Sequence, residues 1–445
     1  MKAARDLRAI HNLAPLIRAG SVSPVDLVRN CFNRIDARPE LNAFIAVFRD
    51  QALEDARQAE RDIRSGRYLG SLHGIPVSVK DLLDVAGTPT TAGSRVPATV
   101  AAADAPVVPR LRSAGAIIIG KTNLHEFAFG TTSDETAFGP VRHPDDVTRS
   151  AGGSSGGSAA AIAEGMCFAS VGTDTGGSIR IPAAACGIVG LKPTLGEISC
   201  DGVVPLSTTL DHVGPMARSV IDTGLMFQAM KGVSVHGIAP AGGRLVFGAP
   251  RPYFFDNLDP GAQRAVETAV TRLREAGYSV QNTTIEHAEW TADIYLHIVL
   301  PEASARHARG LEEHADKYSP GVRLRLEMGR YLLAEDYVRA MRLRQELTHA
   351  VDRALAGCDA LVLPTMPIPA PRVGAASVDV NGVSAPVRAT MLRLTQLFDI
   401  TGHPAIALPA GRGPEGLPRS VQLVGHRGRT ERLLDIAAAL EQLIH

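Results

Sequence analysis

The spacing of apolar residues changes along the N-terminal part of the chain, and each pattern predicts a different element. Residues 1–20 interleave apolar side chains with charges every few positions, as an amphipathic helix does. Ser23 followed by Pro24 is typical of a helix start, since serine caps the first turn and proline fits within it. Residues 74–81 (GIPVSVKD) alternate apolar with other side chains, which predicts a short strand ending at Lys80. We therefore expect helices over about the first sixty residues and then a strand.

Further short apolar runs predict buried strands between helical segments. The run from Ala116 to Ile119 is β-branched and bounded by glycines, and 244–249 and 358–363 have a similar character. Residues 284–356 are the most continuously helical part, and they fit either a cap inserted over a site or a surface layer. Because helices alternate with short buried strands, we expect an α/β fold built in layers.

Composition narrows the class of protein without indicating its chemistry. The chain has 445 residues, of which 45% are hydrophobic and 21% charged, as in ordinary soluble globular proteins. Its 46 basic and 46 acidic residues balance, so we expect neither nucleic acid nor a membrane surface as a partner. No apolar run is as long as a membrane span, and the charged N-terminus does not resemble a signal peptide. Five widely spaced cysteines predict a reduced, cytoplasmic protein without a metal centre.

Residues 115–122 (GAIIIGKT) match the spacing of a phosphate-binding loop, but their composition argues against that function. A phosphate loop needs flexible residues after a strand, so that exposed N–H groups can surround the anion. Here Ala116 is followed by three isoleucines, and no strand is predicted before Gly115. We therefore expect a strand at this place and no nucleotide site.

Residues 152–156 (GGSSG) match the nucleophile elbow of α/β-hydrolases, with Ser154 at the centre. An elbow requires an apolar strand directly before it, whereas residues 142–151 (RHPDDVTRSA) are polar and contain a proline. A flexible linker is excluded as well, because Ala159 to Ile162 resume an apolar helix at once. Neither a nucleophile elbow nor a flexible linker therefore explains this glycine- and serine-rich region.

A longer pattern explains it better. Three ordered segments carry the pattern: 74–87 (GIPVSVKDLLDVAG), 152–165 (GGSSGGSAAAIAEG) and 172–194 (GTDTGGSIRIPAAACGIVGLKPT). Two flanking segments agree with it: 120–130 (GKTNLHEFAFG) and 202–219 (GVVPLSTTLDHVGPMARS). Together they resemble the amidase signature family, including the offset of 24 positions from Ser154 to Ser178. The resemblance covers the chain from about residue 10 to its end and weakens between about 225 and 355.

The residues around Ser178 also indicate a nucleophile without reference to the family. A serine hydroxyl attacks only when a base removes its proton, and glycines let the backbone approach a substrate closely. The apolar sequence after Ser178 is typical of a helix start, whose N–H groups favour negative charge. We therefore predict an oxyanion hole formed by the N–H groups of Thr175, Gly176, Gly177 and Ser178.

Lys80 is the predicted base, because no histidine lies in a comparably distinctive setting. Burial at a strand end would lower the pKa of its amine and make the neutral form available. The relay between the base and the nucleophile comes from the resemblance, which implies that Ser154 follows a cis peptide bond from Gly153. In this scheme Ser154 passes the proton between Ser178 and Lys80.

For the residues near the two serines, the sequence allows both a functional and a purely structural role. Ser155 is counted among the substrate-binding residues, although we favour a supporting hydrogen bond over a direct role. Asp174 and Arg180 flank the nucleophile and are expected to pair as a brace of the loop. Three residues are predicted to line the acyl pocket, with simple packing equally favoured: Phe129, Gly130 and Thr131.

The resemblance implies one α/β/α domain over residues 1–445, built on a mixed, twisted sheet of about eleven strands. Residues 284–356, from their own helical pattern, are a candidate cap or insertion within this domain. It implies no metal and no organic cofactor. The implied function is a serine hydrolase that cleaves C–N bonds of small amides through an acyl-enzyme, with esters and carbamates (urethanase-like activity) as further substrates. A homodimer is a further hypothesis about its assembly.

Two other functions remain open at this stage. The first is the glutaminase, or A, subunit of a tRNA-dependent amidotransferase, which would require partner subunits; residues 326–340 (LEMGRYLLAEDYVRA) resemble that protein faintly. The second is a non-catalytic binding protein, which the intact set of Lys80, Ser154 and Ser178 argues against.

Overall fold

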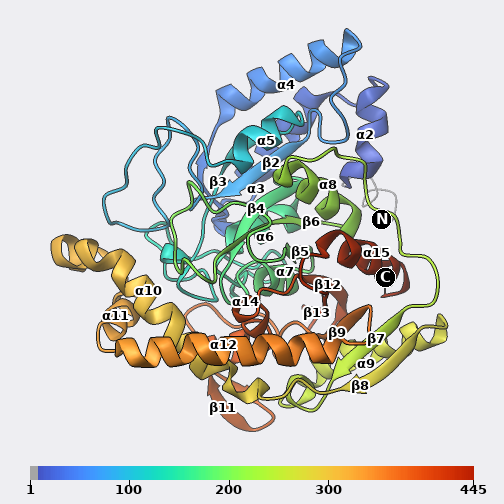
Figure 1. Cartoon of the computed structure of the whole chain (residues 1–445). Coiled ribbons are helices and arrows are strands. Elements are labelled where there is room, and N and C mark those ends of the chain that lie inside the picture. Colours follow the sequence, from blue (N-terminus) through green and yellow to red (C-terminus); the bar gives the residue numbers. More distant parts are fainter. Residues whose placement is uncertain (1–8, 445) are drawn as a thin grey trace.

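The computed structural model describes residues 9–444, and a mixed sheet of eleven strands runs through its middle (Figure 1). The strands follow one another across the sheet in the order β1-β3-β2-β4-β6-β5-β12-β13-β9-β7-β8. Their bounds are β1 Phe44–Val47, β2 Pro76–Lys80, β3 Ile117–Thr122, β4 Ala169–Asp174, β5 Val189–Lys192, β6 His212–Ala217, β7 Val246–Pro250, β8 Ser279–Thr283, β9 Ala360–Pro364, β12 Ala405–Arg412 and β13 Pro418–Val424. β2 pairs in parallel with β3 and β4, whereas the strands from β4 to β9 pair antiparallel. The predicted mixed sheet of about eleven strands is confirmed.

Helices surround this sheet, and a small hairpin lies apart from it. The helices are α2 Ile10–Arg18, α3 Pro24–Ala37, α4 Arg49–Arg64, α5 Val107–Ser113, α6 Gly156–Glu164, α7 Arg180–Cys186, α8 Val220–Lys231, α9 Pro260–Glu275, α10 Thr291–His314, α11 Pro320–Gly329, α12 Ala334–Leu355, α13 Val387–Leu392, α14 Leu397–Ile400 and α15 Thr430–Ile444. The hairpin pairs β10 (Ser377–Val380) with β11 (Val383–Pro386). This arrangement confirms the single α/β/α domain expected from the sequence.

The isoleucines of β3 show how the sheet separates two apolar cores. Ile117 and Ile119 belong to the smaller core, which also holds buried residues of α3, α4 and α6. Ile118 belongs to the larger core, together with buried residues of α5 and α8. Side chains alternate between the faces of a strand, so a continuous apolar run is stable only where helices cover both faces.

The N-terminal prediction is correct in part. Residues 1–8 of the predicted amphipathic helix lie outside the described residues. Within the rest of the predicted helix, Ile10–Arg18 forms α2. Ser23 caps α3 as expected, since its Oγ accepts a hydrogen bond from the N–H of Asp26. The expectation of helices alone over about the first sixty residues is wrong, because Phe44–Val47 forms β1 at the edge of the sheet. Four residues are too few to show the alternation by which a strand is recognised.

The residues that imitate a phosphate loop form a strand. Ile117–Thr122 is β3, and it begins after α5 rather than after another strand. Lys121 is buried within it, with its Nζ 2.7 Å from a carboxylate oxygen of Asp81. That amine also donates to the carbonyl of Pro89 at 2.9 Å. Lys121 is therefore bound within the protein and does not extend from a flexible loop.

Residues 284–356 are mainly helical, as predicted. In Figure 1 α10 and α12 lie along one end of the molecule, with α11 between them. Glu302 of α10 joins this segment to a loop before β6, because its carboxylate accepts hydrogen bonds from the hydroxyls of Ser207 and Thr209 at 2.5 and 2.8 Å. The segment is thus attached to the loop before β6.

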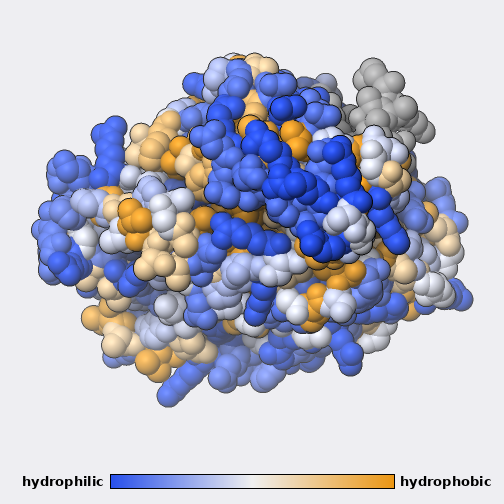
Figure 2. Space-filling model, turned by 90° about the horizontal axis from the view of Figure 1, so that it is seen from above, coloured by the Kyte–Doolittle hydropathy of each residue, from blue (hydrophilic) through white to orange (hydrophobic). Residues whose placement is uncertain are grey.

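The surface over α4 is mainly hydrophilic, as Figure 2 shows for the face seen from above. The exposed positions of α4 carry charged and amide side chains, and only alanines of this helix are buried. An amphipathic helix covering the sheet has this composition.

Candidate active site

Lys80 ends β2, where the parallel neighbours β3 and β4 enclose it. Its side chain is fully buried, and its Nζ donates to Ser154 Oγ at 2.7 Å and to Thr173 Oγ1 at 2.8 Å. Burial disfavours the ammonium form and lowers the pKa of Lys80 to about 7. A substantial fraction of this amine is therefore neutral near neutral pH, as a general base requires.

Ser154 lies in the loop before α6, and the Gly153–Ser154 peptide bond is cis, as the resemblance implies. The carbonyl of Ser154 accepts hydrogen bonds from the N–H of His125 and from Ser133 Oγ, both at 3.1 Å. These two bonds hold the backbone of Ser154 in place. The Ser154 hydroxyl is thereby held against the lysine amine.

Ser178 lies in the loop between β4 and α7 and is 6% exposed, so it is close to the surface of the site. Its carbonyl accepts a hydrogen bond from the N–H of Ser155 at 3.2 Å, which brings the loop of Ser178 beside that of Ser154. The structure therefore assembles Lys80, Ser154 and Ser178 from three separate segments.

The loop of Ser178 presents backbone N–H groups that have no partner within the protein. Between residues 9 and 444 no hydrogen bond is donated by the N–H groups of Thr175, Gly176, Gly177 or Ser178. Thr395 Oγ1 donates to the carbonyl of Gly176 at 2.6 Å, which fixes the orientation of the neighbouring peptide. Gly177 has a φ of 140°, a conformation that L side chains rarely adopt. Such a row of free N–H groups can stabilise an oxyanion.

A buried ionic network holds this loop from behind. Arg180 donates to both oxygens of Asp174 at 3.0 and 3.1 Å and to Asp399 at 2.5 Å. Burial alone would raise the pKa of Asp174, but the charge and hydrogen bonds of Arg180 keep it well below its usual range. Burial and the nearby Asp174 raise the pKa of Asp399 well above its usual range. The expected pair of Asp174 and Arg180 thus braces the loop, with Asp399 as a third member.

A second buried lysine shows why geometry is needed to choose the base. Burial lowers the pKa of Lys192 to about 7 as well. Its Nζ, however, lies 3.1 Å from His212 Nε2 and donates to the carbonyl of Pro193 at 3.0 Å. Burial and Lys192 hold the pKa of His212 well below its usual range, so this imidazole is neutral and accepts there. Of these two lysines only Lys80 donates to a serine of the site.

The predicted substrate-binding residues lie in two different settings. Phe129, Gly130 and Thr131 are all buried, and a Cβ on Gly153 would lie 2.8 Å from the carbonyl carbon of Thr131. This segment is therefore packed against the loop of Ser154. Ser155 Oγ instead donates to the carbonyl of Thr173 at 3.2 Å, which favours the supporting role over contact with a substrate.

Several contacts at the site were not foreseen from the sequence. Thr173 Oγ1 accepts a hydrogen bond from Lys80. Thr173 lies within the segment 172–194 that the sequence indicates, but no role for its side chain is predicted there. Thr175 Oγ1 donates to Asp211 at 2.6 Å, and burial raises the pKa of this carboxyl to about 6. Tyr295 reaches the loop from α10, since a Cβ on Gly176 would lie 2.7 Å from its hydroxyl. Tyr295 follows this loop by more than a hundred positions, so no local pattern could reveal the contact.

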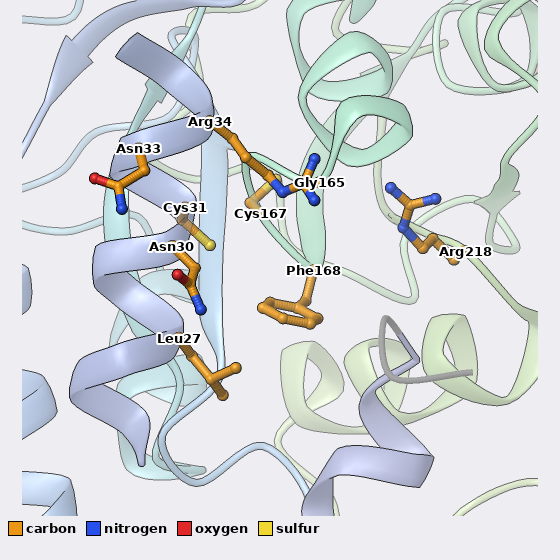
Figure 3. A pocket seen from close by; sticks show the side chains of 9 residues that line it. All are labelled: Leu27, Asn30, Cys31, Asn33, Arg34, Gly165, Cys167, Phe168 and Arg218. Carbon is orange, nitrogen blue, oxygen red and sulfur yellow. The ribbon is translucent and has the colours of Figure 1, made fainter. Parts of the chain in front are cut away.

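A separate pocket of about 440 Å³ contains none of the predicted site residues; Leu27, Asn30, Cys31, Asn33, Arg34, Gly165, Cys167, Phe168 and Arg218 line it (Figure 3). Its two arginines bind the end of α6: Arg34 donates to the carbonyl of Glu164 at 3.1 Å, and Arg218 to that of Ala163 at 2.9 Å. Cations at a helix C-terminus stabilise its free carbonyl groups. These arginines therefore serve the helix end.

Two further features are absent from the part of the chain between residues 9 and 444. No helix there has the length and apolar character needed to cross a membrane. No group of three or more His, Cys, Asp or Glu side chains in the same part is arranged to hold a metal ion.

Comparisons with known proteins show the family to which the chain belongs. The family model described as amidase matches residues 26–434. An amidase from Pseudomonas putida is 39% identical, over 91% of this chain and 89% of its own. A crystal structure of an amidase superposes with a TM-score of 0.94 at 37% identity, covering 98% of this chain and all of that one. The A subunit of a glutamyl-tRNA(Gln) amidotransferase from Carboxydothermus hydrogenoformans is 34% identical over 96% of this chain and 95% of its own. This chain belongs to the amidase family and is a hydrolase of C–N amide bonds.

Proposed function

We propose that this amidase hydrolyses small amides through an acyl-enzyme on Ser178, with Lys80 as base and Ser154 as proton relay. The observation that carries the proposal is the buried contact of 2.7 Å between Lys80 Nζ and Ser154 Oγ, next to the loop of Ser178. A buried lysine whose pKa is about 7 can accept a proton at neutral pH, which an exposed lysine cannot.

The first half of the reaction forms the acyl-enzyme. Neutral Lys80 takes the hydroxyl proton of Ser154, Ser154 takes that of Ser178, and Ser178 Oγ bonds to the amide carbon. When the carbonyl re-forms, the C–N bond breaks and the proton returns through Ser154 to the leaving nitrogen.

The second half of the reaction hydrolyses the acyl-enzyme. Water attacks the ester, giving one proton to the same relay. The ester bond breaks, and the relay returns the proton to Ser178 as the carboxylic acid leaves.

The oxyanion of each tetrahedral intermediate is stabilised by the N–H groups of residues 175–178. These donors have no partner to lose within the described protein, so they are preorganised for negative charge. Removing one such donor typically costs about 3–4 kcal/mol of transition-state stabilisation.

The same machinery extends the proposal to esters and carbamates. Both have a carbonyl carbon open to Ser178, and an ester has a better leaving group than an amide. Carbamate cleavage needs the same protonation of a leaving nitrogen or oxygen by Ser154. The partner of the enzyme in this proposal is thus a small amide, ester or carbamate.

Glutamine hydrolysis within a multi-subunit amidotransferase is a second candidate. It is favoured by the similarity to the A subunits of amidotransferases along nearly the full chain, at 34% identity for the one from Carboxydothermus hydrogenoformans. The amidase from Pseudomonas putida has the higher identity of 39%, so the free-standing amidase remains our conclusion. Glutaminase activity that requires a co-purifying partner would reverse this choice.

The test is a panel of p-nitroanilides, nitrophenyl esters and aryl carbamates. Hydrolysis by the wild type is expected to fall by a factor of about 10⁴ or more in Ser178→Ala, since the loss of a nucleophile disables the whole relay. Ser65→Ala, which changes an exposed serine at the C-terminal end of α4, serves as the control and should retain activity. Undiminished hydrolysis by a correctly folded Ser178→Ala protein would overturn the assignment.

A further inference from the structure

Arg388 is a guanidinium without an acidic partner at the border of the candidate active site. It lies on α13, with its Cζ 5.6 Å from the centre of the Phe129 ring. Its residue is partly exposed, but its Nε is buried and has no hydrogen-bond partner. Among residues 9–444 no carboxylate forms an ion pair with it, and its titratable neighbours are Tyr295 and Arg325. A buried N–H donor is normally hydrogen-bonded, so the unpartnered Nε of this arginine requires an explanation.

The helix that carries Arg388 faces the loop of Ser178. Leu392, four residues later on α13, has its Cδ2 3.1 Å from the position of a Cβ on Gly176. Residues four positions apart lie on the same face of a helix, so Arg388 and Leu392 point toward the same side. Phe129, which the Arg388 guanidinium covers, belongs to the segment packed against Ser154. Arg388 is therefore placed on the acyl side of the site.

The surrounding groups leave one positive charge uncompensated. Arg325 also lies over the Phe129 ring, with its Cζ at 5.3 Å, but it donates to Glu135 at 3.1 Å. Tyr295 cannot compensate Arg388, because burial raises the pKa of its phenol far above neutrality. The phenol is thus neutral at any pH at which the enzyme would work. The described part of the chain thus leaves this guanidinium open to an anion from outside.

We propose that Arg388 binds a carboxylate carried by the acyl chain of the substrate, so that the enzyme prefers amides of dicarboxylic acids that keep one free carboxylate. This deepens the proposed function and rests on it. A guanidinium presents two parallel N–H donors that match a carboxylate. Leu392 of the same short helix lies beside Gly176, so a carboxylate held by Arg388 would leave the amide carbonyl of the substrate near the N–H groups of residues 175–178.

The test compares two anilides of equal length: succinic acid mono-p-nitroanilide and its methyl ester. The wild type is expected to show a kcat/KM about 10- to 100-fold higher for the acid, as a charge-assisted bidentate contact provides. Arg388→Gln should lose this preference, because its kcat/KM for the acid falls to that for the methyl ester. Arg388→Lys should keep part of it, since the charge remains and the fork is lost.

Arg393→Gln is the matched control. Arg393 is close to Arg388 in sequence, but its guanidinium donates to the carbonyls of Tyr253 and Asp256. Arg393→Gln lowers the positive charge of this region by the same amount as Arg388→Gln. We nevertheless expect the preference for the acid to persist in Arg393→Gln. Equal losses in Arg388→Gln and Arg393→Gln would overturn the proposal, as would an Arg388→Gln enzyme that still prefers the acid.

A binding measurement separates this proposal from the proposed function. Calorimetry with Ser178→Ala protein measures the affinity for the same acid and methyl ester without turnover. Preferential binding of the acid that is lost in Ser178→Ala/Arg388→Gln supports the carboxylate site, even if no anilide is hydrolysed. Equal binding of the acid and the methyl ester to Ser178→Ala refutes the carboxylate site. If the wild type hydrolyses neither compound but Ser178→Ala binds the acid selectively, only the catalytic assignment is refuted.

Discussion

Lys80 shows how burial changes the chemistry of a single residue. An exposed lysine is protonated at neutral pH, whereas the buried environment of Lys80 lowers its pKa to about 7. The two groups that accept its hydrogen bonds are hydroxyls, Ser154 Oγ and Thr173 Oγ1, and neither compensates the charge of an ammonium as a carboxylate would. The amine is consequently available as a base.

The pH dependence of activity follows from this lysine. Because the proposed mechanism uses the neutral amine as base, kcat/KM is expected to rise with pH through a midpoint near the pKa of about 7 and then level off. Thr173→Val removes an acceptor that stabilises the ammonium, so the pKa of Lys80 falls further and the midpoint moves to lower pH. Initial rates between about pH 5 and pH 9 measure both profiles. A midpoint that stays in place, or moves up, would contradict the role of Lys80.

The close approach of Gly176 to Tyr295 makes a second prediction at this scale. A Cβ at position 176 would lie 2.7 Å from the Tyr295 hydroxyl, closer than atoms normally pack. Gly176→Ala should therefore displace the oxyanion donors and lower kcat by about 100- to 1000-fold, with a smaller change in KM.

A double variant checks the cause of that loss. Removing the hydroxyl in Tyr295→Phe relieves the closest contact, so the double variant is expected to recover part of the kcat lost in Gly176→Ala. If the two effects are simply additive, the collision with Tyr295 is not the cause.

At the scale of elements, the turn from β4 to α7 depends on Arg180. This guanidinium joins Asp174 at the end of β4 to Asp399 on α14, and it also donates to the carbonyl of Thr395 at 2.9 Å. Thr395 in turn holds the carbonyl of Gly176. One buried side chain thus connects a strand, a helix and the candidate oxyanion loop.

Arg180→Met is expected to lower the free energy of unfolding by about 3–5 kcal/mol, because it leaves Asp174 buried without its cation. Activity should fall with stability, since the loop of Ser178 loses its support. Urea denaturation and kcat measured on the same samples check both effects. Arg309→Met, which removes an arginine from an exposed ion pair on α10, should leave both unchanged; an equal effect of the two variants would refute the brace.

At the scale of the whole molecule, α10–α12 influence the site through a chain of contacts. Glu302 accepts from the Ser207 hydroxyl, and the N–H of Ser207 donates to Asp211 at 3.1 Å. Asp211 accepts from Thr175 beside the oxyanion loop. The helical segment is therefore expected to support the site structurally, in addition to the contact that Tyr295 makes with the loop of Gly176.

Glu302→Gln tests this connection, because the amide nitrogen cannot accept the hydrogen bonds that a carboxylate oxygen accepts. We expect a loss of about 1–3 kcal/mol in stability from the donors left without an acceptor. Faster amide hydrogen exchange should appear in residues 205–211, far from position 302 in sequence. Glu313→Gln on the exposed face of α10 is the control, and exchange confined to α10 in Glu302→Gln would argue against coupling.

The local sequence by itself determined the elements and the polar groups on which the site is built. Apolar runs bounded by glycines or helical segments located β3, β7 and β9, since a buried strand needs such residues. The glycine- and serine-rich segments located the loops of Ser154 and Ser178, because close backbone approach requires small residues. β1 could not be located in this way, as Phe44–Val47 is too short to carry a pattern.

Only the tertiary structure decided which distant side chains complete the site. Tyr295, Arg388 and Thr395 follow Ser178 by more than a hundred positions and stand in sequence that resembles ordinary helix or loop. The structure also chose between two buried lysines of similar pKa, because only Lys80 reaches Ser154. Periodicity records which face of an element is buried, whereas the partner on that face is fixed by packing between elements far apart in the chain.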